Sequence, residues 1–475
     1  MTPYEYFSLY WSKEIFEIFY EQSTLYAHQK DGIILNSSIE EMEQFIGILL
    51  FMGLVKMPAI KMYWAAETRF AAIADIMSRN RFEQLRKYLH VANNDNTTTA
   101  NDPAHDKLFK IRPLLSVLRT NMQETPPEER HSVDEQMIPF KGRSNLKQYV
   151  KGKPHKWGFK VFMRAGESGM MYDFEIYTGK GTCEDFGLGF SGDIVMALTS
   201  ELPEGKNFKL YFDNWFSSLQ LAIALKERGI FCVGTIRSDR MGGCSLSSEA
   251  QLKLSGRGSY DWRVETEGNV ALIRWYDRKA VNFVCTYSPV DPEGKCKRWS
   301  AADKKSIEIK CPNVVKEYNA FMGGVDLADM LIELYRVDIR SVKWYTRIIY
   351  WCLSVAVVNA WLLYRRHQQQ KNLKFHFSLA NFQSQIAAAL LKAGQFKSKK
   401  RNSQETSSKA PKRKLFAVRP VDDVRYDGYQ HWPEYSAKGR CKFCPNGFTQ
   451  VTCTKCKINL CMTPAKNCFL NFHTK

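Results

Sequence analysis

Aspartates occur in three short segments whose surroundings favour metal chemistry. Asp134 interrupts a predicted strand, Asp213 follows a short apolar run, and Asp326 and Asp329 follow Gly323-Gly324. Carboxylates from distant segments can hold a pair of magnesium ions, which clamp the attacking and leaving oxygens of a phosphodiester. Taken singly, each segment has a plain structural alternative: an exposed strand face for Asp134, a turn for Asp213 and a helix start for Asp326 and Asp329. Together they predict metal-dependent cutting or joining of nucleic acid.

A second segment combines basic and aromatic side chains. It lies between Asp134 and Asp213, and it contains no acidic residue from Lys141 to Lys160. Cations that alternate with aromatic rings can neutralise phosphates and stack against unpaired bases. The alternative is a solvated loop followed by a β-hairpin. The side chains predicted to contact DNA are Lys141, Arg143, Lys147, Lys151, Lys153, Lys156, Trp157 and Lys160.

The last part of the sequence carries a compact group of cysteines and histidines. Its two Cys-x2-Cys pairs, two further cysteines and one histidine give seven potential ligands, a spacing typical of zinc sites. Two tetrahedral zinc ions need eight ligands, and His431 is the nearest candidate for the eighth. We therefore predict two structural zinc ions. Their predicted ligands are His431, Cys441, Cys444, Cys453, Cys456, Cys461, Cys468 and His473.

Composition describes a folded, basic protein. The 475 residues are 44% hydrophobic and carry a formal net charge of +19, which creates a field suited to polyanions such as nucleic acid. The first residues lack the pattern of a signal peptide. Residues 348–364 are nearly long and apolar enough for a membrane span, but the helical spacing of their bulky side chains favours a buried helix. We therefore expect no membrane partner.

Hydrophobic periodicity divides the chain into helical and mixed parts. Residues 1–129 read as helical, with a capping box at 38–41, an amphipathic helix with a basic face at 79–89, and an apolar stripe from Leu108 to Leu118. From about residue 130, three antiparallel strands followed by alternating helix and strand predict an RNase H-like mixed sheet. The predicted strands are 132–140, 158–164, 171–177, 209–212 and 231–236, with a helix capped by Ser217 or Ser218 before the last.

The remaining segments differ in character. Residues 237–311 read as an insertion that contains a small β-hairpin at 269–275 and 280–287, and the chain reads as helical from 314 to 392. Between Lys397 and Lys414, eight basic residues against one acidic residue predict a disordered basic linker. Pro411-Lys412-Arg413-Lys414 resembles a nuclear localisation signal, so we expect a nuclear protein.

These residues together resemble the piggyBac-type DNA transposases and the host genes derived from them. The resemblance covers nearly the whole chain in order. The motifs that carry it are Arg81-Phe82-x2-Leu85-x3-Leu89-His90, Asp106-Lys107-Leu108-x-Lys110-Ile111-Arg112-Pro113, Ser132-Val133-Asp134-Glu135, Gly152-Lys153-Pro154-x-Lys156-Trp157-Gly158, Phe212-Asp213-Asn214-Trp215-Phe216, Tyr318-Asn319-x3-Gly323-Gly324-Val325-Asp326-x2-Asp329 and the terminal Cys/His segment.

The resemblance implies a DDD transposase with an RNase H-like catalytic domain. Asp134, Asp213 and Asp326 would form its catalytic triad and bind two Mg²⁺ or Mn²⁺ ions, with Asp329 as an accessory residue. Such enzymes excise and insert elements at TTAA targets by nicking, hairpin formation and strand transfer. The implied partners are double-stranded DNA at transposon ends and TTAA targets, together with a second copy of the chain in a homodimer. The cross-braced zinc module would read the terminal sequences.

The resemblance and the composition together predict the domain order. The predicted domains are a helical dimerisation and DNA-binding domain in two parts (1–129 and 331–395), an RNase H-like catalytic domain in two parts (130–236 and 312–330), a β-rich insertion domain (237–311), a basic flexible linker (396–428) and a Cys/His-rich zinc-binding domain (429–475).

Two other functions are compatible with parts of the sequence. A domesticated, catalytically silent DNA-binding or chromatin protein would keep the fold and the zinc module without strand transfer. A ubiquitin ligase or histone reader would explain the zinc module but would leave the three aspartates without a role. All three triad positions are occupied here, which is necessary but not sufficient for catalysis, so the sequence leans toward an active enzyme without separating it from a domesticated DNA-binding protein.

Overall fold

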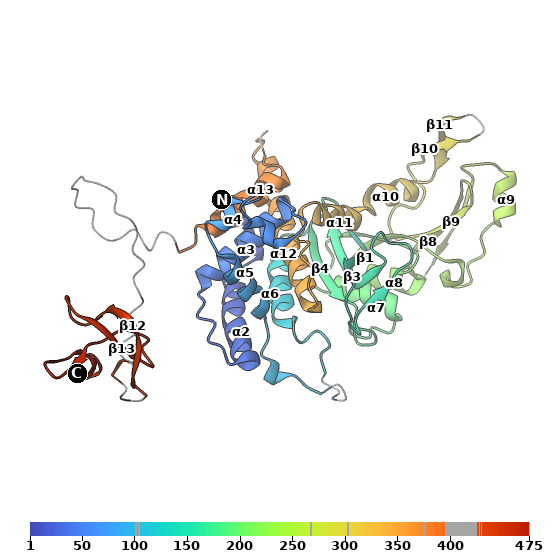
Figure 1. Ribbon diagram of the computed structural model, residues 1–475. Helices are drawn as coiled ribbons and strands as arrows, with labels where there is room; N and C mark the ends of the chain where they lie inside the picture. Colours follow the sequence, from blue (N-terminus) through green and yellow to red (C-terminus); the bar gives the residue numbers. More distant parts are fainter. Residues whose placement is uncertain are drawn as a thin grey trace. The chain divides into compact units, whose positions relative to one another are not determined.

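The computed structural model describes residues 1–474 except 100–101, 103–104, 267, 302–303, 374–375, 395–424, 427 and 429. The chain divides into two compact units, residues 1–400 and 401–475, and each is described by itself (Figure 1). Most of the basic linker predicted at 396–428, including the motif at 411–414, lies outside the described residues.

Helices from both ends of the first unit pack into one hydrophobic core. Contacts between α3 and α13, and between α1 and α12, join segments that are more than three hundred residues apart in sequence. The helices of this part are α1 (Pro3–Tyr10), α2 (Lys13–Asp31), α3 (Ile39–Leu54), η1 (Ile60–Tyr63), α4 (Ala71–Ala74), α5 (Arg79–Tyr88), η2 (Asn94–Asn96), α6 (Arg112–Gln123), α12 (Trp344–Gln370) and α13 (Leu379–Leu391).

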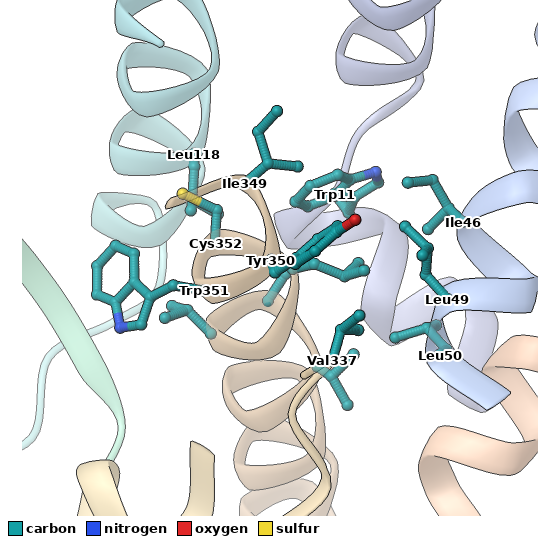
Figure 2. Packing of buried hydrophobic residues seen from close by; sticks show 14 of the residues in the cluster. Trp11, Ile46, Leu49, Leu50, Leu118, Val337, Ile349, Tyr350, Trp351 and Cys352 are labelled. Atoms are coloured by element: carbon teal, nitrogen blue, oxygen red, sulfur yellow. The ribbon is translucent and has the colours of Figure 1, made fainter. Parts of the chain in front are cut away.

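Helix α12 forms the centre of this core. Among the described residues, it is the one helix long and apolar enough to cross a membrane by length and composition, and 94% of its most apolar stretch is buried inside the unit. Figure 2 shows its residues directed toward Leu118 on one side and toward Trp11 and Leu49 on another. The prediction of a buried helix is confirmed, because neighbouring helices cover its apolar surface on several sides.

The predicted start of α3 is confirmed in part. Ser38 caps the helix, and its hydroxyl accepts a hydrogen bond from the Glu41 amide at 3.2 Å. The reciprocal bond of a capping box is replaced, because the Glu41 carboxylate accepts from the Arg81 guanidinium at 2.6 and 2.7 Å. Arg81 belongs to α5, the predicted amphipathic helix, so this ion pair joins two helices that a local sequence pattern cannot relate.

The described strands of the first unit form a mixed nine-stranded sheet. Its order is β2-β3-β1-β5-β6-β9-β8-β7, with β4 also pairing with β3. The strands are β1 (Arg130–Pro139), β2 (Gln148–Tyr149), β3 (Trp157–Gly166), β4 (Met171–Ile176), β5 (Lys209–Phe212), β6 (Phe231–Thr235), β7 (Tyr260–Glu265), β8 (Val270–Tyr276) and β9 (Ala280–Cys285).

The strands predicted between residues 132 and 236 are all present. β1 pairs antiparallel with β3 and parallel with β5, and β5 pairs parallel with β6. The β3–β4 hairpin turns through Gly169 at φ 84°, and Ser218 caps α8 (Leu219–Glu227) by accepting from the Leu221 amide. The sequence did not predict α7 (Phe190–Leu198), because its start follows a glycine-rich segment and has no side-chain cap.

The segment 237–311 contributes to two different sheets. The predicted hairpin is present as β8 and β9, and β9 pairs with β6, so the hairpin extends the main sheet. β10 (Gly294–Ser300) and β11 (Lys305–Cys311) form a separate antiparallel ribbon. The other short elements here are η3 (Ser238–Arg240) and α9 (Glu249–Leu254), and the chain then continues into α10 (Asn313–Phe321) and α11 (Gly324–Tyr335).

The second unit is small and its core is rich in cysteine. Strands β12 (Pro433–Arg440) and β13 (Phe448–Cys453) pair antiparallel, as do β14 (Met462–Thr463) and β15 (Lys466–Asn467), and α15 (Cys468–His473) follows. Six cysteines lie in or against its hydrophobic cluster, which contains few large apolar side chains. A core of this composition needs additional cross-links in order to hold a fold.

Candidate catalytic site and metal centres

Two of the predicted triad residues are neighbours in the central sheet. Val133 of β1 pairs with Phe212 of the parallel strand β5, so Asp134 and Asp213 are the next residues in the same direction on adjacent strands. The Asp134 carboxylate accepts from the Glu135 amide at 2.7 Å, and the Asp213 carboxylate accepts from the Trp215 amide at 2.9 Å. Strand pairing therefore fixes both side chains at one edge of the site.

The third aspartate is carried by a helix that is pinned to β1. Asp326 lies exposed in the first turn of α11, and the buried Ser132 hydroxyl accepts from the Val325 amide at 3.0 Å. A Cβ on Gly324 would lie 2.5 Å from the Gly166 carbonyl oxygen, so only glycine allows this close approach. Gly324, whose Cβ would also lie 2.6 Å from the Ser132 hydroxyl, thus lets the start of α11 approach the strand that carries Asp134.

The electrostatics of the site reflect the shared location of these carboxylates. Burial raises the pKa of Asp134 to about 7, Lys153 opposes this shift, and Glu135 and Asp213 add to it. Burial also raises the pKa of Asp213. The pKa of the Tyr318 hydroxyl is raised first by burial and then by Asp213, Asp134 and Asp326. All three aspartates therefore act on one phenol group.

The three carboxylates are not packed as closely as the ligands of a single ion. Among the described residues, the groups whose ligand atoms all lie within 4.8 Å of one another are two Cys/His sets in the second unit. Two metal ions about 4 Å apart do not require such close approach, because each ion contacts a different subset of the carboxylates.

Asp329 has a structural environment different from that of the triad. Its carboxylate accepts from the Gln136 amide at 2.6 Å, and the Gln136 carbonyl oxygen accepts from the Trp351 indole at 2.8 Å. Gln136 is 2% exposed, so this chain of hydrogen bonds links α11, β1 and α12 in the interior. Asp329 therefore anchors the helix that carries Asp326.

The basic segment divides into two groups of side chains. Lys153 donates to the Glu135 carbonyl oxygen at 2.7 Å, and the Lys153 and Lys160 ammonium groups lie 3.8 and 4.0 Å from the Glu135 carboxylate. Lys147 lies 5.0 Å above the Trp157 ring. The exposed members of the segment are Lys141, Arg143, Lys151, Lys156 and Trp157.

Sequence reasoning missed several residues that shape this site. Glu135 stands between the lysines and Asp134, Ser132 positions α11, and Tyr318 lies near all three aspartates. Glu135 and Ser132 flank Asp134 in the sequence, but an acid and a hydroxyl in a strand carry no signal of their own. The position of Lys153 beside Glu135 required knowledge of how the loop between β2 and β3 folds.

The eight predicted cysteine and histidine ligands fall into two interleaved sets. His431, Cys453, Cys456 and His473 form one set, and Cys441, Cys444, Cys461 and Cys468 form the other, each with all ligand atoms within 4.8 Å of one another. His431 therefore belongs to the first set as its fourth potential ligand, and this brings the total to the eight that two tetrahedral zinc ions would need. This alternation along the chain is the cross-braced arrangement predicted from the sequence.

The ligand spacing fits tetrahedral zinc. Zinc–ligand bonds of about 2.3 Å to sulfur and about 2.0 Å to nitrogen place neighbouring ligands roughly 3.6–3.8 Å apart. Cys456 lies 3.5 Å from His431 Nδ1 and 3.4 Å from His473 Nε2, and the Cys444 and Cys461 sulfurs lie 3.9 Å apart. Both sets could thus hold a metal ion, and their thiolate and imidazole ligands are those that zinc prefers.

Two further features prepare these sets for a metal. The His473 Nδ1 lies 2.8 Å from the Phe469 carbonyl oxygen, which directs Nε2 toward Cys456 when Nδ1 donates. A Cβ on Gly447 would lie 2.5 Å from the Cys444 sulfur and 2.7 Å from the Cys461 sulfur. The turn after the first Cys-x2-Cys pair therefore requires glycine.

Comparison with known proteins finds relatives that agree with one another, because all are described as transposases or as transposable element-derived proteins. The family model described as Transposase IS4 matches residues 2–361. PiggyBac transposable element-derived protein 3 of Homo sapiens is 32% identical over 485 aligned residues, covering 100% of this chain and 76% of the relative. PiggyBac transposable element-derived protein 2 of Homo sapiens is 30% identical, covering 90% of this chain and 72% of the relative.

A solved structure shares the fold. The cryo-EM structure of a piggyBac transposase synaptic complex with hairpin DNA aligns with a TM-score of 0.70 and 20% sequence identity, covering 97% of this chain and 95% of that one. The fold match, which covers 97% of this chain, agrees with the sequence matches, which cover 90% and 100% of it. The chain therefore belongs to the piggyBac-type transposase family.

Proposed function

We propose that this protein cleaves DNA at transposon ends and transfers the strands to TTAA targets, using Asp134, Asp213 and Asp326 in an RNase H-like domain. The observation that carries this proposal is the pairing of Val133 with Phe212, which places two aspartates side by side on parallel strands. The antiparallel β3–β1 pair beside the parallel strands β5 and β6 supports the RNase H-like assignment. The solved neighbour is a complex with hairpin DNA, which supports DNA as substrate.

Each residue of the site has a role in this proposal. Asp134, Asp213 and Asp326 would hold two Mg²⁺ or Mn²⁺ ions, and the ions would stabilise the attacking and leaving oxygens. Lys153 and Lys160 lie beside the Glu135 carboxylate and make the field at the site less negative. Tyr318, which is partly buried and whose hydroxyl is influenced by all three aspartates, offers a hydroxyl group near the site.

The cleavage reaction is the test of this function. Purified protein should nick a duplex that carries its own terminal repeats when magnesium is added, and it should produce a DNA hairpin. Absence of nicking under these conditions, with DNA binding retained, would favour the second candidate described below.

We expect metal binding at the site to weaken as the pH falls through 7. A metal ion binds the deprotonated carboxylate. Below pH 7 the Asp134 carboxyl group, whose pKa is raised to about 7, is mostly protonated, so the metal ion must displace that proton in order to bind. The deprotonated fraction falls about ten-fold between roughly pH 8 and roughly pH 6. The Kd for Mn²⁺, measured by electron paramagnetic resonance in the full chain, should rise by the same factor.

Lys153→Gln is the matched variant for this measurement. Lys153 lowers the pKa of Asp134, so its loss should move the midpoint of the pH dependence upward. Equal Mn²⁺ affinities at both pH values would contradict the assignment of Asp134 as a ligand.

We also propose that the exposed basic side chains of the loop before β3 contact phosphates. Lys151 and Lys156 are exposed, whereas Lys153 and Lys160 are directed to Glu135. Replacing Lys151 and Lys156 with alanine should weaken binding to all DNA sequences alike, and should reduce the slope of log affinity against log salt by about two. A salt titration by fluorescence anisotropy measures this slope, and an unchanged slope would remove both side chains from the interface.

The zinc module, the assembly and the location complete the proposal. Two zinc ions would stabilise residues 431–475, and the module would contact the terminal sequences of the element.

A homodimer would bring two DNA ends together, and action on chromosomal DNA would require entry into the nucleus. Sedimentation of the DNA complex tests the dimer, and localisation of a tagged chain tests the compartment.

A second candidate function is DNA binding without catalysis. Both human relatives named above are described as transposable element-derived proteins, which favours a domesticated role. Such a protein would bind DNA through the same surfaces and would not cleave it in magnesium. The nicking assay distinguishes the two functions directly.

A further inference from the structure

A carboxylate on α10 is held by two tyrosines, one from β5 and one that follows β9. The Glu317 Oε2 accepts a hydrogen bond from the Tyr211 hydroxyl at 2.9 Å and another from the Tyr287 hydroxyl at 2.7 Å. The two hydroxyl oxygens lie 2.9 Å apart, so the three groups form a closed triangle, here called the Glu317 clamp. Burial raises the pKa of both phenols, which therefore stay protonated and can donate at neutral pH. The clamp joins α10 to the main sheet.

The register of the sheet places this clamp beside the triad. Tyr211 of β5 pairs with Ser132 of β1, and the Ser132 hydroxyl accepts from the Val325 amide at the start of α11. Asp134 and Asp213 lie two residues further along the chain from this pair. Side chains two positions apart on a strand point to the same face of the sheet. The pair that anchors α10 and α11 is therefore adjacent to the pair of aspartates.

Helix α10 connects the clamp to the third aspartate. It packs on the sheet through a buried cluster that contains Val315 and Tyr211. Met322 and Gly323 alone separate α10 from α11, which carries Asp326 in its first turn (Figure 1). A shift of α10 along the sheet would therefore move the start of α11, and it would move Asp326 relative to the aspartates on the strands.

We propose that Glu317 is a positioning residue for the metal ions, because by holding α10 on β5 it sets the distance between Asp326 and Asp213. Metal ligands must be held to within about 0.5 Å of their productive positions, and residues that orient ligands contribute about 10- to 100-fold to metal affinity. Glu317 would act through α10 and α11 without touching an ion. The inference rests on the proposed function only for the presence of metal at the triad.

The Mn²⁺ affinity of the full chain, purified with zinc, tests this inference without DNA and without cleavage. Electron paramagnetic resonance at pH 8 gives the Kd of the parent, Glu317→Ala and Glu317→Gln. Asp261→Ala is the matched control, because Asp261 of β7 accepts hydrogen bonds from the Ser247 amide and hydroxyl and its loss makes the same change in charge outside the triad. Asp213→Asn reports whether the triad binds the ion.

Glu317→Ala should raise the Kd for Mn²⁺ about 10-fold, because α10 loses its hydrogen bonds to the sheet. Glu317→Gln should restore most of the affinity, since the amide oxygen can still accept from both phenols. A role through negative charge alone would make the glutamine variant as weak as the alanine variant, and this result would overturn the proposal. Tyr287→Phe should weaken binding in the parent but add nothing in Glu317→Ala, because the clamp is already open there.

The other outcomes separate this inference from the proposed function. Equal Kd values for Glu317→Ala, Asp261→Ala and the parent, with weaker binding by Asp213→Asn, would overturn the positioning role and leave the proposed function intact. Unchanged binding by Asp213→Asn would overturn the proposed function and the inference with it. A lower melting temperature of Glu317→Ala with an unchanged Kd would show that the clamp only stabilises the fold, and it would overturn the inference alone.

Discussion

Replacing Asp213 with asparagine should reduce magnesium-dependent strand cleavage by more than about 100-fold. Loss of residues that only orient metal ligands costs about 10- to 100-fold, and loss of a direct ligand should cost more. The amide keeps the shape of the carboxylate, and its oxygen can still accept from the Trp215 amide. The fold and DNA binding should therefore persist while the charge that holds the ion is removed.

Single-turnover cleavage of a labelled terminal-repeat duplex measures this effect. Asp239→Asn is a suitable control, because Asp239 is an exposed aspartate in η3 outside the triad, and its cleavage rate should match that of the parent. Cleavage by Asp213→Asn at the parental rate would remove Asp213 from the mechanism. Loss of DNA binding together with cleavage would instead indicate a folding defect, which a melting curve identifies.

Replacing Cys453 with serine should unfold the second unit. Cys453 is 0% exposed and contributes to the set that contains His431, Cys456 and His473. Structural zinc in small domains supplies apparent binding free energies of about 10–16 kcal/mol, so little folding free energy remains without it. Zinc analysis of the full chain should give two ions per parent chain and fewer than two per variant chain. Limited proteolysis should then cut residues 431–474 rapidly.

Two further variants make this test specific. Cys244→Ser, in the first unit and outside both sets, should leave the zinc content at two. His431→Ala should lose one zinc and leave the Cys441 set occupied. Retention of two zinc ions after Cys453→Ser would contradict the assignment of the ligand sets.

Much of the fold was predictable because local patterns specify it. The strands around Asp134 and Asp213 follow from alternating and short apolar runs, and the capped helix after Ser218 follows from its sequence. The residues of the two Cys/His sets follow from their spacing, because a tetrahedral ion would require four ligands close together. The strands and the capped helix depend on residues that are near one another in the chain, whereas each Cys/His set joins residues from distant positions, such as His431 and His473.

Tertiary structure decided what each of those residues contacts. The predicted hairpin β8–β9 extends the main sheet, because β9 pairs with β6, and pairing partners at such distances leave no local signal. Lys153, one of the side chains predicted to contact DNA, donates to the Glu135 carbonyl oxygen, and the folding of its loop decides that contact. Arg86 of α5 donates to the Arg340 carbonyl oxygen, a contact across 254 residues that no local pattern predicts.

The sequence by itself therefore determined the chemical groups: three aspartates, eight cysteines and histidines that could bind metal, and a strongly basic composition. It also determined the local elements that carry them, since hydrophobic period and turn residues act over a few positions. The tertiary structure decided the contacts among these groups. Parallel pairing of β1 with β5 and the Ser132–Val325 hydrogen bond bring the aspartates to one place. Those contacts depend on packing between distant segments, which no short pattern specifies.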